Sequence, residues 1–353
     1  MKKRVLIFLA LLLIASACSV ETQPTGIVTP TLSASGTGNW YAVYFTDPNS
    51  PVANSFRGGP DEALAAAIDQ SRLSVDMAIY DLNLWSIRDT LIAAHRRGVT
   101  VRLVMESDNM DEQEVQDLMA AGIEVLGDRH ESLMHGKFVV IDRSEVWTGS
   151  MNFTMGGGYL DNNNLVLIRS TKLAEDYTTE FEQMFVKDAF SNEKQPKTPN
   201  PSITVNGTPV EVSFSPQDGT LKHILELVIS AKENIRFMAY SFTSDELREA
   251  LIERASAGVE VQGVFDEDQA NSNIGTEYEA LKNAGIDIRL DGNPHLMHHK
   301  VIIIDNQIVV TGSYNFSNNA EYNNDENTII IHNSDIAAQY LEEFHQVYNE
   351  SAR

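Results

Sequence analysis

The chain contains nearly the same twenty-one residues twice. The first copy, LMHGKFVVIDRSEVWTGSMNF, begins at Leu133, and the second, LMHHKVIIIDNQIVVTGSYNF, begins at Leu296. Shorter matches flank both copies in the same order, such as AAGIEVL from Ala120 and NAGIDIRL from Asn283. Because motifs repeat in order at a spacing of 163 residues, the sequence predicts an internal duplication, in which two similar units are built on one plan.

Each copy alternates short β-branched apolar runs with amphipathic segments, which indicates strands alternating with helices. Helices are predicted around residues 86–97, 111–121 and 173–185. Aligning MAIY from Met77 with MAYS from Met238 places two of the strands in register. Continuous apolar strands such as KVIIID are typical of a sheet covered by helices on both faces, so the predicted fold class is α/β, twice. Strands are predicted at 73–80, 99–105, 137–142, 145–149 and 164–169, and again at 234–241, 259–265, 300–305, 307–312 and 327–332.

The first twenty residues have the layout of a secretory signal. Three basic residues precede an apolar run from residue 5 to 14 and the small residues 15–17. The alternative, a membrane-spanning anchor, needs a longer apolar run. Cys18, the only cysteine, follows at once, as in the lipobox of bacterial lipoproteins, although the same small residues suit an ordinary cleavage site. We therefore expect a bacterial-type protein exported to the cell envelope, either anchored through a lipid on Cys18 or secreted.

Changes of composition along the chain predict its domain boundaries. Segments rich in Ser, Thr, Pro and Gly divide two α/β units of similar length. The predicted order is a signal peptide at 1–17, a flexible tether at 18–39, a first domain at 40–190, a linker at 191–202 and a second domain at 203–353.

The chain is strongly acidic, with 26 Lys and Arg against 50 Asp and Glu and a net charge of −24. Proteins that bind nucleic acids usually carry a basic face, and the densest basic cluster here is His95-Arg96-Arg97. This composition disfavours nucleic acid as a partner, although residues distant in sequence can still assemble a local basic patch.

Within the repeated stretch the matching residues are mostly polar, whereas the apolar ones vary. A histidine and a lysine two positions apart on a strand project from the same face and can meet one ligand. Imidazole can act as a nucleophile or proton shuttle, and the lysine ammonium suits phosphoryl oxygens. Each copy therefore predicts half of a phosphoryl-transfer site. The matching pairs are His135 and His298, Lys137 and Lys300, Asp142 and Asp305, Gly149 and Gly312, Ser150 and Ser313, and Asn152 and Asn315.

The spacing His-x-Lys-x4-Asp-x6-Gly-Ser-x-Asn, complete in both copies, resembles the phospholipase D superfamily. The resemblance implies two α-β-α sandwich domains that pair by pseudo-twofold symmetry, so that one chain, expected to be a monomer, holds both motifs in one cleft. One histidine would form a covalent phosphohistidine and the other would act as acid and base. The usual order makes His135 the nucleophile and His298 the acid, but the near-symmetry of the motifs leaves the reverse order open. No metal or other cofactor is implied.

The resemblance also suggests roles for the other motif residues. Lysines and asparagines would hold the nonbridging oxygens, with the two serines among the substrate-binding residues: Lys137, Lys300, Asn152, Asn315, Ser150 and Ser313. The turn residues Asp142 and Asp305 belong to the same catalytic set and are expected to fix the backbone and the lysines.

A histidine nucleophile also needs an acceptor for its second ring nitrogen. Glu326, 28 positions after His298, is a candidate for orienting a histidine. The corresponding position after His135 holds Asn163, whose role is open, and Asp161 nearby is a weaker candidate.

Other conspicuous residues have simpler explanations. Trp147 is expected in the core, and His299, which has no counterpart in the first copy, is expected at the surface or rim. The three glycines at 156–158 lack the ending of a phosphate-binding loop and are expected to form a flexible turn beside the site.

Several activities on different phosphodiester substrates are compatible with these sequence features. An exported enzyme that hydrolyses phospholipid to phosphatidic acid and a free headgroup fits the signal and the charge. A metal-independent endonuclease of the same superfamily is the alternative. A phosphatidyltransferase like cardiolipin synthase would normally have N-terminal membrane spans, and a nonenzymatic lipid-anchored binding module would not need both motifs intact.

Overall fold

The computed structural model describes residues 36–351, which lie in one compact unit. The predicted signal peptide and Cys18 lie outside the described residues. Within 36–351 no helix is both long enough and apolar enough to cross a bilayer. The end of the predicted tether is structured, because β1 (Gly36–Thr37) pairs with the strand that follows it.

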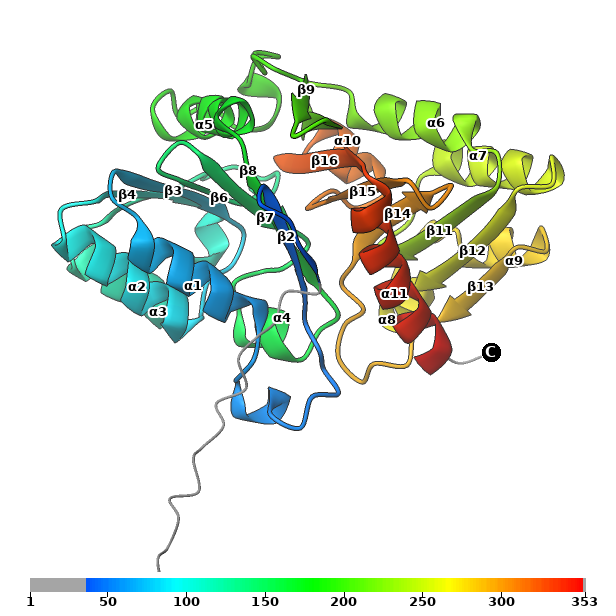
Figure 1. Cartoon of the computed structure of the whole chain (residues 1–353), viewed down its shortest axis with the longest axis horizontal. Helices are drawn as coiled ribbons and strands as arrows, with labels where there is room; N and C mark the ends of the chain where they lie inside the picture. Colours follow the sequence, from blue (N-terminus) through cyan, green and yellow to red (C-terminus); the bar gives the residue numbers. More distant parts are fainter. Residues whose placement is uncertain (1–35, 352–353) are drawn as a thin grey trace, which may run out of the picture. The chain divides into compact units, whose positions relative to one another are not determined.

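Two eight-stranded sheets form the framework, and their strand orders match position by position (Figure 1). The first has the order β1-β2-β8-β7-β6-β3-β4-β5, and the second β9-β10-β16-β15-β14-β11-β12-β13 when read in the equivalent direction. In each sheet the last three strands of this order are parallel and the others antiparallel. The bounds in the first sheet are β2 (Tyr41–Phe45), β3 (Ser74–Ile79), β4 (Thr100–Met105), β5 (Glu124–Gly127), β6 (Lys137–Ile141), β7 (Glu145–Gly149) and β8 (Asn164–Arg169). Those in the second are β9 (Ser202–Val205), β10 (Thr208–Ser215), β11 (Asn234–Ala239), β12 (Glu260–Phe265), β13 (Asp287–Leu290), β14 (Lys300–Ile304), β15 (Ile308–Gly312) and β16 (Glu326–His332).

Helices cover both faces of the first sheet, with α1, α2 and α3 on one face and α5 on the other (Figure 1). The second half repeats this plan with α6, α7 and α9 and, at the chain end, α11. Side-chain caps start several helices: Ser170 accepts a hydrogen bond from the backbone N–H of Leu173 in α5, and Asn333 accepts one from Ile336 in α11. The bounds are α1 (Pro60–Gln70), α2 (Trp85–Arg96), α3 (Gln113–Ala120), α4 (Met155–Tyr159), α5 (Thr171–Phe185), α6 (Thr220–Ser230), α7 (Asp245–Ser256), α8 (Glu267–Ser272), α9 (Tyr278–Asn283), α10 (Asn318–Tyr322) and α11 (Ser334–Glu350).

The duplicated α/β prediction is confirmed, with one error of register. Ile79 pairs with Lys137 and Ala239 pairs with Lys300, so the residues that follow β3 and β11, Tyr80 and Tyr240, are equivalent. The predicted alignment of MAIY with MAYS is therefore wrong by one residue, because it matched identical letters rather than the spacing of 160 residues that β4 and β12 also follow.

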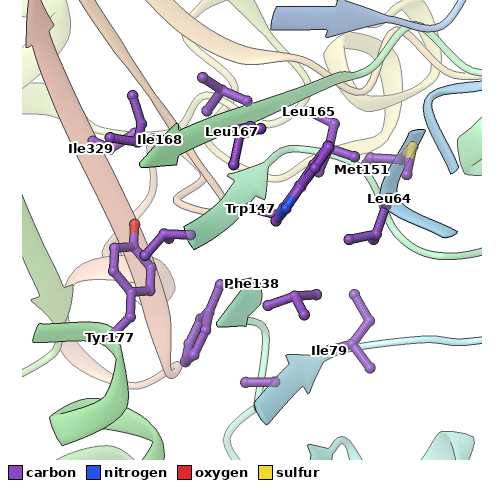
Figure 2. Close-up of a cluster of buried hydrophobic side chains, with 14 of the residues drawn as sticks. Leu64, Ile79, Phe138, Trp147, Met151, Leu165, Leu167, Ile168, Tyr177 and Ile329 are labelled. Carbon is purple, nitrogen blue, oxygen red and sulfur yellow. The ribbon is translucent and has the colours of Figure 1, made fainter. Parts of the chain in front are cut away.

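One hydrophobic cluster runs through both halves. Trp147, predicted as a core residue, is 2% exposed, and Figure 2 shows it near Leu165 and Met151, with Ile329 of β16 beside Ile168 in the same cluster. The ring of Tyr177 lies 4.9 Å from that of Phe138 and 5.1 Å from that of Phe214 on β10, centroid to centroid. The halves therefore share part of their core, which fixes one motif relative to the other.

The segment 191–202, predicted as a linker, is held against the fold along α5. It begins with the 3-10 helix η3 (Ser191–Glu193). The backbone N–H of Gln195 donates to Gln183 of α5 at 2.9 Å, and that of Asn200 donates to Asp176 of α5 at 2.7 Å. The segment thus crosses between the two sheets as an ordered, hydrogen-bonded strap.

Candidate functional site

Each motif loop is bound to the loop that leads into the last strand of the other half. The backbone N–H of His135 donates to the carbonyl of Asp325 at 3.0 Å, and that of His298 donates to the carbonyl of Asn162 at 3.0 Å. A second backbone bond completes each of these parallel bridges. The two motifs are therefore brought into one site by symmetric contacts between the halves.

His135 is oriented by a carboxylate from the other half. Both carboxylate oxygens of Glu326 lie 2.9 Å from Nδ1 of His135. Glu326 lies 28 positions after His298 along the chain, yet it contacts the other histidine. Because an ionised carboxylate only accepts hydrogen bonds, Nδ1 of His135 carries the proton and Nε2 is left as the free nitrogen.

His298 is oriented by an amide instead. The Oδ1 atom of Asn163 lies 3.0 Å from Nδ1 of His298 and accepts from the hydroxyl of Ser150 at 2.8 Å. The Nδ2 atom of Asn163 donates to the carbonyl of Gly157 at 3.1 Å, which fixes the orientation of the amide. His298 must therefore donate from Nδ1 and, like His135, it presents Nε2.

Asp161 is not a histidine partner. Its Oδ1 atom accepts from the backbone N–H of Leu296 at 3.3 Å, in the loop before the second motif. The carboxylate thus supports the loop that carries His298, and the structure corrects the prediction that it could orient a histidine.

The lysines are buried beside the histidines. Nζ of Lys137 donates to the carbonyl of His135 at 2.9 Å, and Nζ of Lys300 donates to the carbonyl of His298 at 3.0 Å. Each lysine side chain is only 1% exposed. The two ammonium groups thus stand at equivalent places with few compensating contacts, which prepares the site for an anion.

Burial lowers the pKa values of both histidines and both lysines. Burial lowers the pKa of His135 to about 4 although Glu326 opposes the shift, and the two ammonium groups lower it as well. Burial lowers the pKa of Lys137 to about 7 against the attraction of Glu326. Burial and the neighbouring cations hold the pKa values of His298 and Lys300 well below their usual ranges. A bound anion would favour the protonated forms of all four groups.

Asn152 and Asn315 occupy matching places, and each is partly exposed. The side-chain oxygen of each is buried and has no hydrogen-bond partner among residues 36–351. An amide oxygen only accepts hydrogen bonds, so this atom could meet a donor group of a ligand, whereas a phosphoryl oxygen would have to be met by the Nδ2 group of the same amide.

The serines of the motifs do not face the substrate space. Ser150 and Ser313 are 0% exposed, and the hydroxyl of Ser313 donates to Glu326 at 2.6 Å as that of Ser150 donates to Asn163. Their burial and their hydrogen bonds therefore do not favour the predicted role of these serines in substrate binding. They hold the two groups that orient the histidines.

The preceding glycines are required by backbone contact. A Cβ on Gly149 would lie 2.2 Å from the carbonyl oxygen of Asn164, and one on Gly312 would lie 2.2 Å from that of Asn327. The φ angles, 152° and 144°, are also ones that other residues rarely adopt. Only glycine allows the strand ends to approach this closely.

Asp142 and Asp305 lie at the opposite ends of β6 and β14 from the histidines. The carboxylate of Asp142 accepts from the backbone N–H groups of residues 72–74, and that of Asp305 accepts from those of 232–234. These aspartates fix the backbone of the turns and contact neither the lysines nor the histidines.

Two tyrosines were missed by the sequence analysis. The ring of Tyr80 lies 5.1 Å from that of His135, and the ring of Tyr240 lies 4.6 Å from that of His298. Nζ of Lys137 lies 5.2 Å from the Tyr80 centroid, and Nζ of Lys300 lies 4.7 Å from the Tyr240 centroid. The correct alignment of β3 with β11 would have revealed them as a repeated pair.

Two further predictions are corrected by burial. His299, expected at the surface or rim, is 0% exposed and lies 3.2 Å from Asn164 and 3.0 Å from Glu343. The glycine run at 156–158 forms part of α4 instead of a flexible turn, and a Cβ on Gly157 would lie 2.4 Å from the carbonyl of Asn152.

These residues make one site that is suited to attack on a phosphoryl group. Two imidazoles present Nε2, and two ammonium groups and two amides can bind the oxygens around phosphorus. In the described part of the chain, no group of three or more His, Cys, Asp or Glu side chains is arranged to hold a metal ion.

Comparison with known proteins also indicates a protein that acts on phosphodiesters. The family model described as "Cardiolipin synthase, PLD-like domain" matches residues 64–185 and 224–348. A "Phospholipase D" of Rickettsia bellii is 32% identical over 168 residues, which are 47% of this chain and 82% of that protein. "Mitochondrial cardiolipin hydrolase" of Mus musculus is 31% identical over 152 residues, 43% of this chain and 66% of that protein. The structure of phosphatidylserine synthase from Haemophilus influenzae shares the fold, with a TM-score of 0.64 at 12% identity over 88% of this chain and 87% of that one. The chain belongs to the phospholipase D superfamily.

Proposed function

We propose that this chain is an exported phosphodiesterase that hydrolyses phospholipids to phosphatidic acid and a free headgroup through a phosphohistidine intermediate. The observation that carries the proposal is the pair of histidines, each held at Nδ1 by the other half of the chain and each presenting Nε2. The relatives named "Phospholipase D" and "Mitochondrial cardiolipin hydrolase" support a lipid phosphodiester as the substrate.

The unequal partners of the histidines support different roles for the two rings. When Nε2 of His135 attacks phosphorus, the ring gains positive charge, which the Glu326 carboxylate stabilises at Nδ1. Asn163 carries no charge, so the protonated form of His298 has no such support and gives up its proton readily. His135 is therefore the nucleophile and His298 the acid.

In the first step the His135 Nε2–P bond forms as the bond from phosphorus to the alcohol oxygen breaks, and His298 transfers its Nε2 proton to the leaving oxygen. In the second step His298 takes a proton from water as the water oxygen attacks phosphorus and His135 leaves. Lys137, Lys300 and the amides of Asn152 and Asn315 stabilise the added charge on the nonbridging oxygens.

The electrostatics around the site favour a single phosphodiester over a polyanion. The charge of Asp81 favours the cationic form of Lys137, and the charges of Asp161 and Asp266 favour that of Lys300, although none of these carboxylates forms an ion pair with either lysine in the described residues. The whole chain carries a net charge of −24. A nucleic-acid backbone would meet repulsion around the site, whereas one lipid phosphate would meet mainly the two lysines.

The test is an assay of the purified chain on phospholipid vesicles and on single- and double-stranded DNA in parallel. Release of headgroup without nicking is expected, together with insensitivity to EDTA. Nicking at moderate salt without lipid turnover would instead establish the endonuclease. His135→Ala and His298→Ala should each abolish turnover, whereas the exposed His223→Ala should have no effect; full activity in either of the first two variants would refute a two-histidine site.

A further inference from the structure

A buried ion cluster connects the strap at 191–202 to both halves. The side chain of Lys194 is 0% exposed, and its Nζ forms ion pairs with Glu180 of α5 and, at 2.7 Å, with Asp325. The carboxylates are 4% and 3% exposed. Burial alone would lower the pKa of Lys194, but the two carboxylates have the larger effect and raise this pKa above its usual value. A cation this deeply buried is costly unless its partners are held in place, so the strap is fixed at this point.

In the part of the chain that the structure describes, two of the three partners of Lys194 are neighbours of Glu326. Asp325 precedes Glu326 in the chain, and its carbonyl accepts from the backbone N–H of His135. Lys194 also donates to the carbonyl of Ser215 at 3.2 Å, and Ser215 pairs with Glu326 between β10 and β16. One ammonium group thus binds both the chain neighbour and the cross-strand partner of Glu326, without contacting Glu326 itself.

On the His298 side, the residue equivalent to Asp325 is Asn162, whose Oδ1 accepts from Nδ2 of Asn293 at 2.8 Å. This is a contact between two neutral amides. Among residues 36–351, a lysine ion pair on the chain neighbour of the orienting group thus occurs beside Glu326 and not beside Asn163.

A second buried contact nevertheless occupies the equivalent place. Glu343 of α11, which matches Glu180 of α5, lies 3.0 Å from Nε2 of His299, and Nδ1 of His299 lies 3.2 Å from Asn164. Asn164 follows Asn163 directly. In each half, a glutamate of the last helix contacts one basic side chain. That side chain in turn contacts a residue next to the one that orients a histidine.

We propose that Lys194 is a positioning residue that holds Glu326 against Nδ1 of His135 through Asp325 and Ser215. Removing the ammonium group leaves two carboxylates buried together, and the loop at 323–325, which also accepts from Ser191, loses its fixed position. Glu326 then no longer holds the His135 ring in the orientation that directs Nε2 at phosphorus. Only the kinetic consequence rests on the proposed function, because the contact with His135 exists without substrate.

The first test compares Lys194→Met with Lys197→Met, a variant of an exposed lysine on the same strap. Proton NMR of the ring Nδ1–H groups should show the low-field His135 resonance in the parent and in Lys197→Met. It should be lost in Lys194→Met, with the His298 resonance retained. We expect kcat to fall about 100-fold in Lys194→Met and KM to change less than about twofold, as misplacement of a reacting group requires. An unchanged His135 resonance in folded Lys194→Met would overturn the proposal.

A second variant separates positioning from stability. In Lys194→Met with Glu180→Gln, one buried carboxylate is removed together with the cation, so the thermal midpoint should recover relative to Lys194→Met. The His135 resonance and kcat should stay reduced. Recovery of the resonance along with the thermal midpoint would mean that Lys194 has a structural role alone, and it would overturn the proposal even if the single variant does not fold. If the parent chain hydrolyses no phosphodiester, the proposed function fails, but the NMR comparison still decides the role of Lys194.

Discussion

The two histidines differ in the charge of the group at Nδ1. His135 faces the carboxylate of Glu326, and His298 faces the amide of Asn163. A carboxylate favours the cationic imidazole and an amide does not, so the two rings have different proton affinities although their motifs match.

Exchanging these groups should separate their roles. Glu326→Gln keeps the size of the side chain but removes the charge, and we expect kcat to fall by about 10² because the cationic ring loses its stabilisation, although the amide oxygen can still accept from Nδ1 as Asn163 does at His298. Asn163→Asp should instead raise the pKa of His298 and move the alkaline limb of the pH–rate profile upward. Profiles of both variants against the parent check this. Equal losses with unshifted profiles would argue against the assignment.

The lowered pKa values also predict the pH dependence of the parent enzyme. His135 must be neutral to attack, which holds above its pKa of about 4, and Lys137 must be charged, which holds below its pKa of about 7. His298 must be protonated, and its pKa is also lowered. Because His298 loses its proton before Lys137 does, we expect kcat/KM to be greatest on the acid side of neutrality, above about pH 4, and to have fallen already at pH 7. The profile of kcat should extend to higher pH, because a bound phosphoryl anion raises the pKa values of the cations. A kcat/KM that still rises above pH 8 would contradict these shifts.

At the scale of the elements, the ends of β7 and β15 bring the motif close to the last strands. Gly149 and Gly312 end these strands against the backbone of β8 and β16, where the residues that orient the histidines begin. The close approach is what lets Ser150 and Ser313 reach Asn163 and Glu326.

Gly312→Ala should therefore be far more damaging than an alanine at another glycine with positive φ. Gly258 is the matched control, with φ 94° and no atom within 4 Å of an added Cβ, so Gly258→Ala should cost about 1 kcal/mol from backbone strain. Gly312→Ala meets the same strain and a backbone clash at 2.2 Å, and we expect it to cost at least about 3 kcal/mol. Urea unfolding of the two variants measures the difference; similar losses would mean that the strand ends tolerate separation.

Features of the fold and the site that depend on residues close together in the sequence could be predicted, whereas those that depend on contacts between the two halves could not. The motif residues and the strands β3, β4, β6, β7 and β8 with their repeats follow from local spacing and periodicity. β2 and β10 were not predicted, and the partner of each histidine could not be, because His135 meets Glu326 only through the packing of one half on the other. The burial of His299 depends on the same packing.

At the scale of the whole molecule, the halves are joined by a shared core and by the bridges at the site. Trp147 and Tyr177 of the first half lie in the same cluster as Phe214 and Ile329 of the second. Since apolar contacts continue across the join, we expect the two halves to unfold together.

A destabilising substitution in one half should thus lower the unfolding midpoint of the other half as well. All three tryptophans lie in the first half, so their fluorescence reports on that half alone. Phe214→Ala, in the second half, should lower the urea midpoint of tryptophan fluorescence and of circular dichroism equally, with a loss of about 3–5 kcal/mol for a large buried ring. Two separated transitions, with the fluorescence midpoint unchanged, would show that the halves unfold independently.

The crossed hydrogen bonds have a consequence for the origin of the repeat. A protein with a single copy could assemble this site only by association of two identical chains, and both histidines would then receive the same partner. Fusion of two copies into one chain removes that constraint, because each half can change without changing the other. The carboxylate at 326 and the amide at 163 are a difference that a symmetric pair of chains could not have. Covalent linkage thus allows two equivalent positions to carry side chains of different charge.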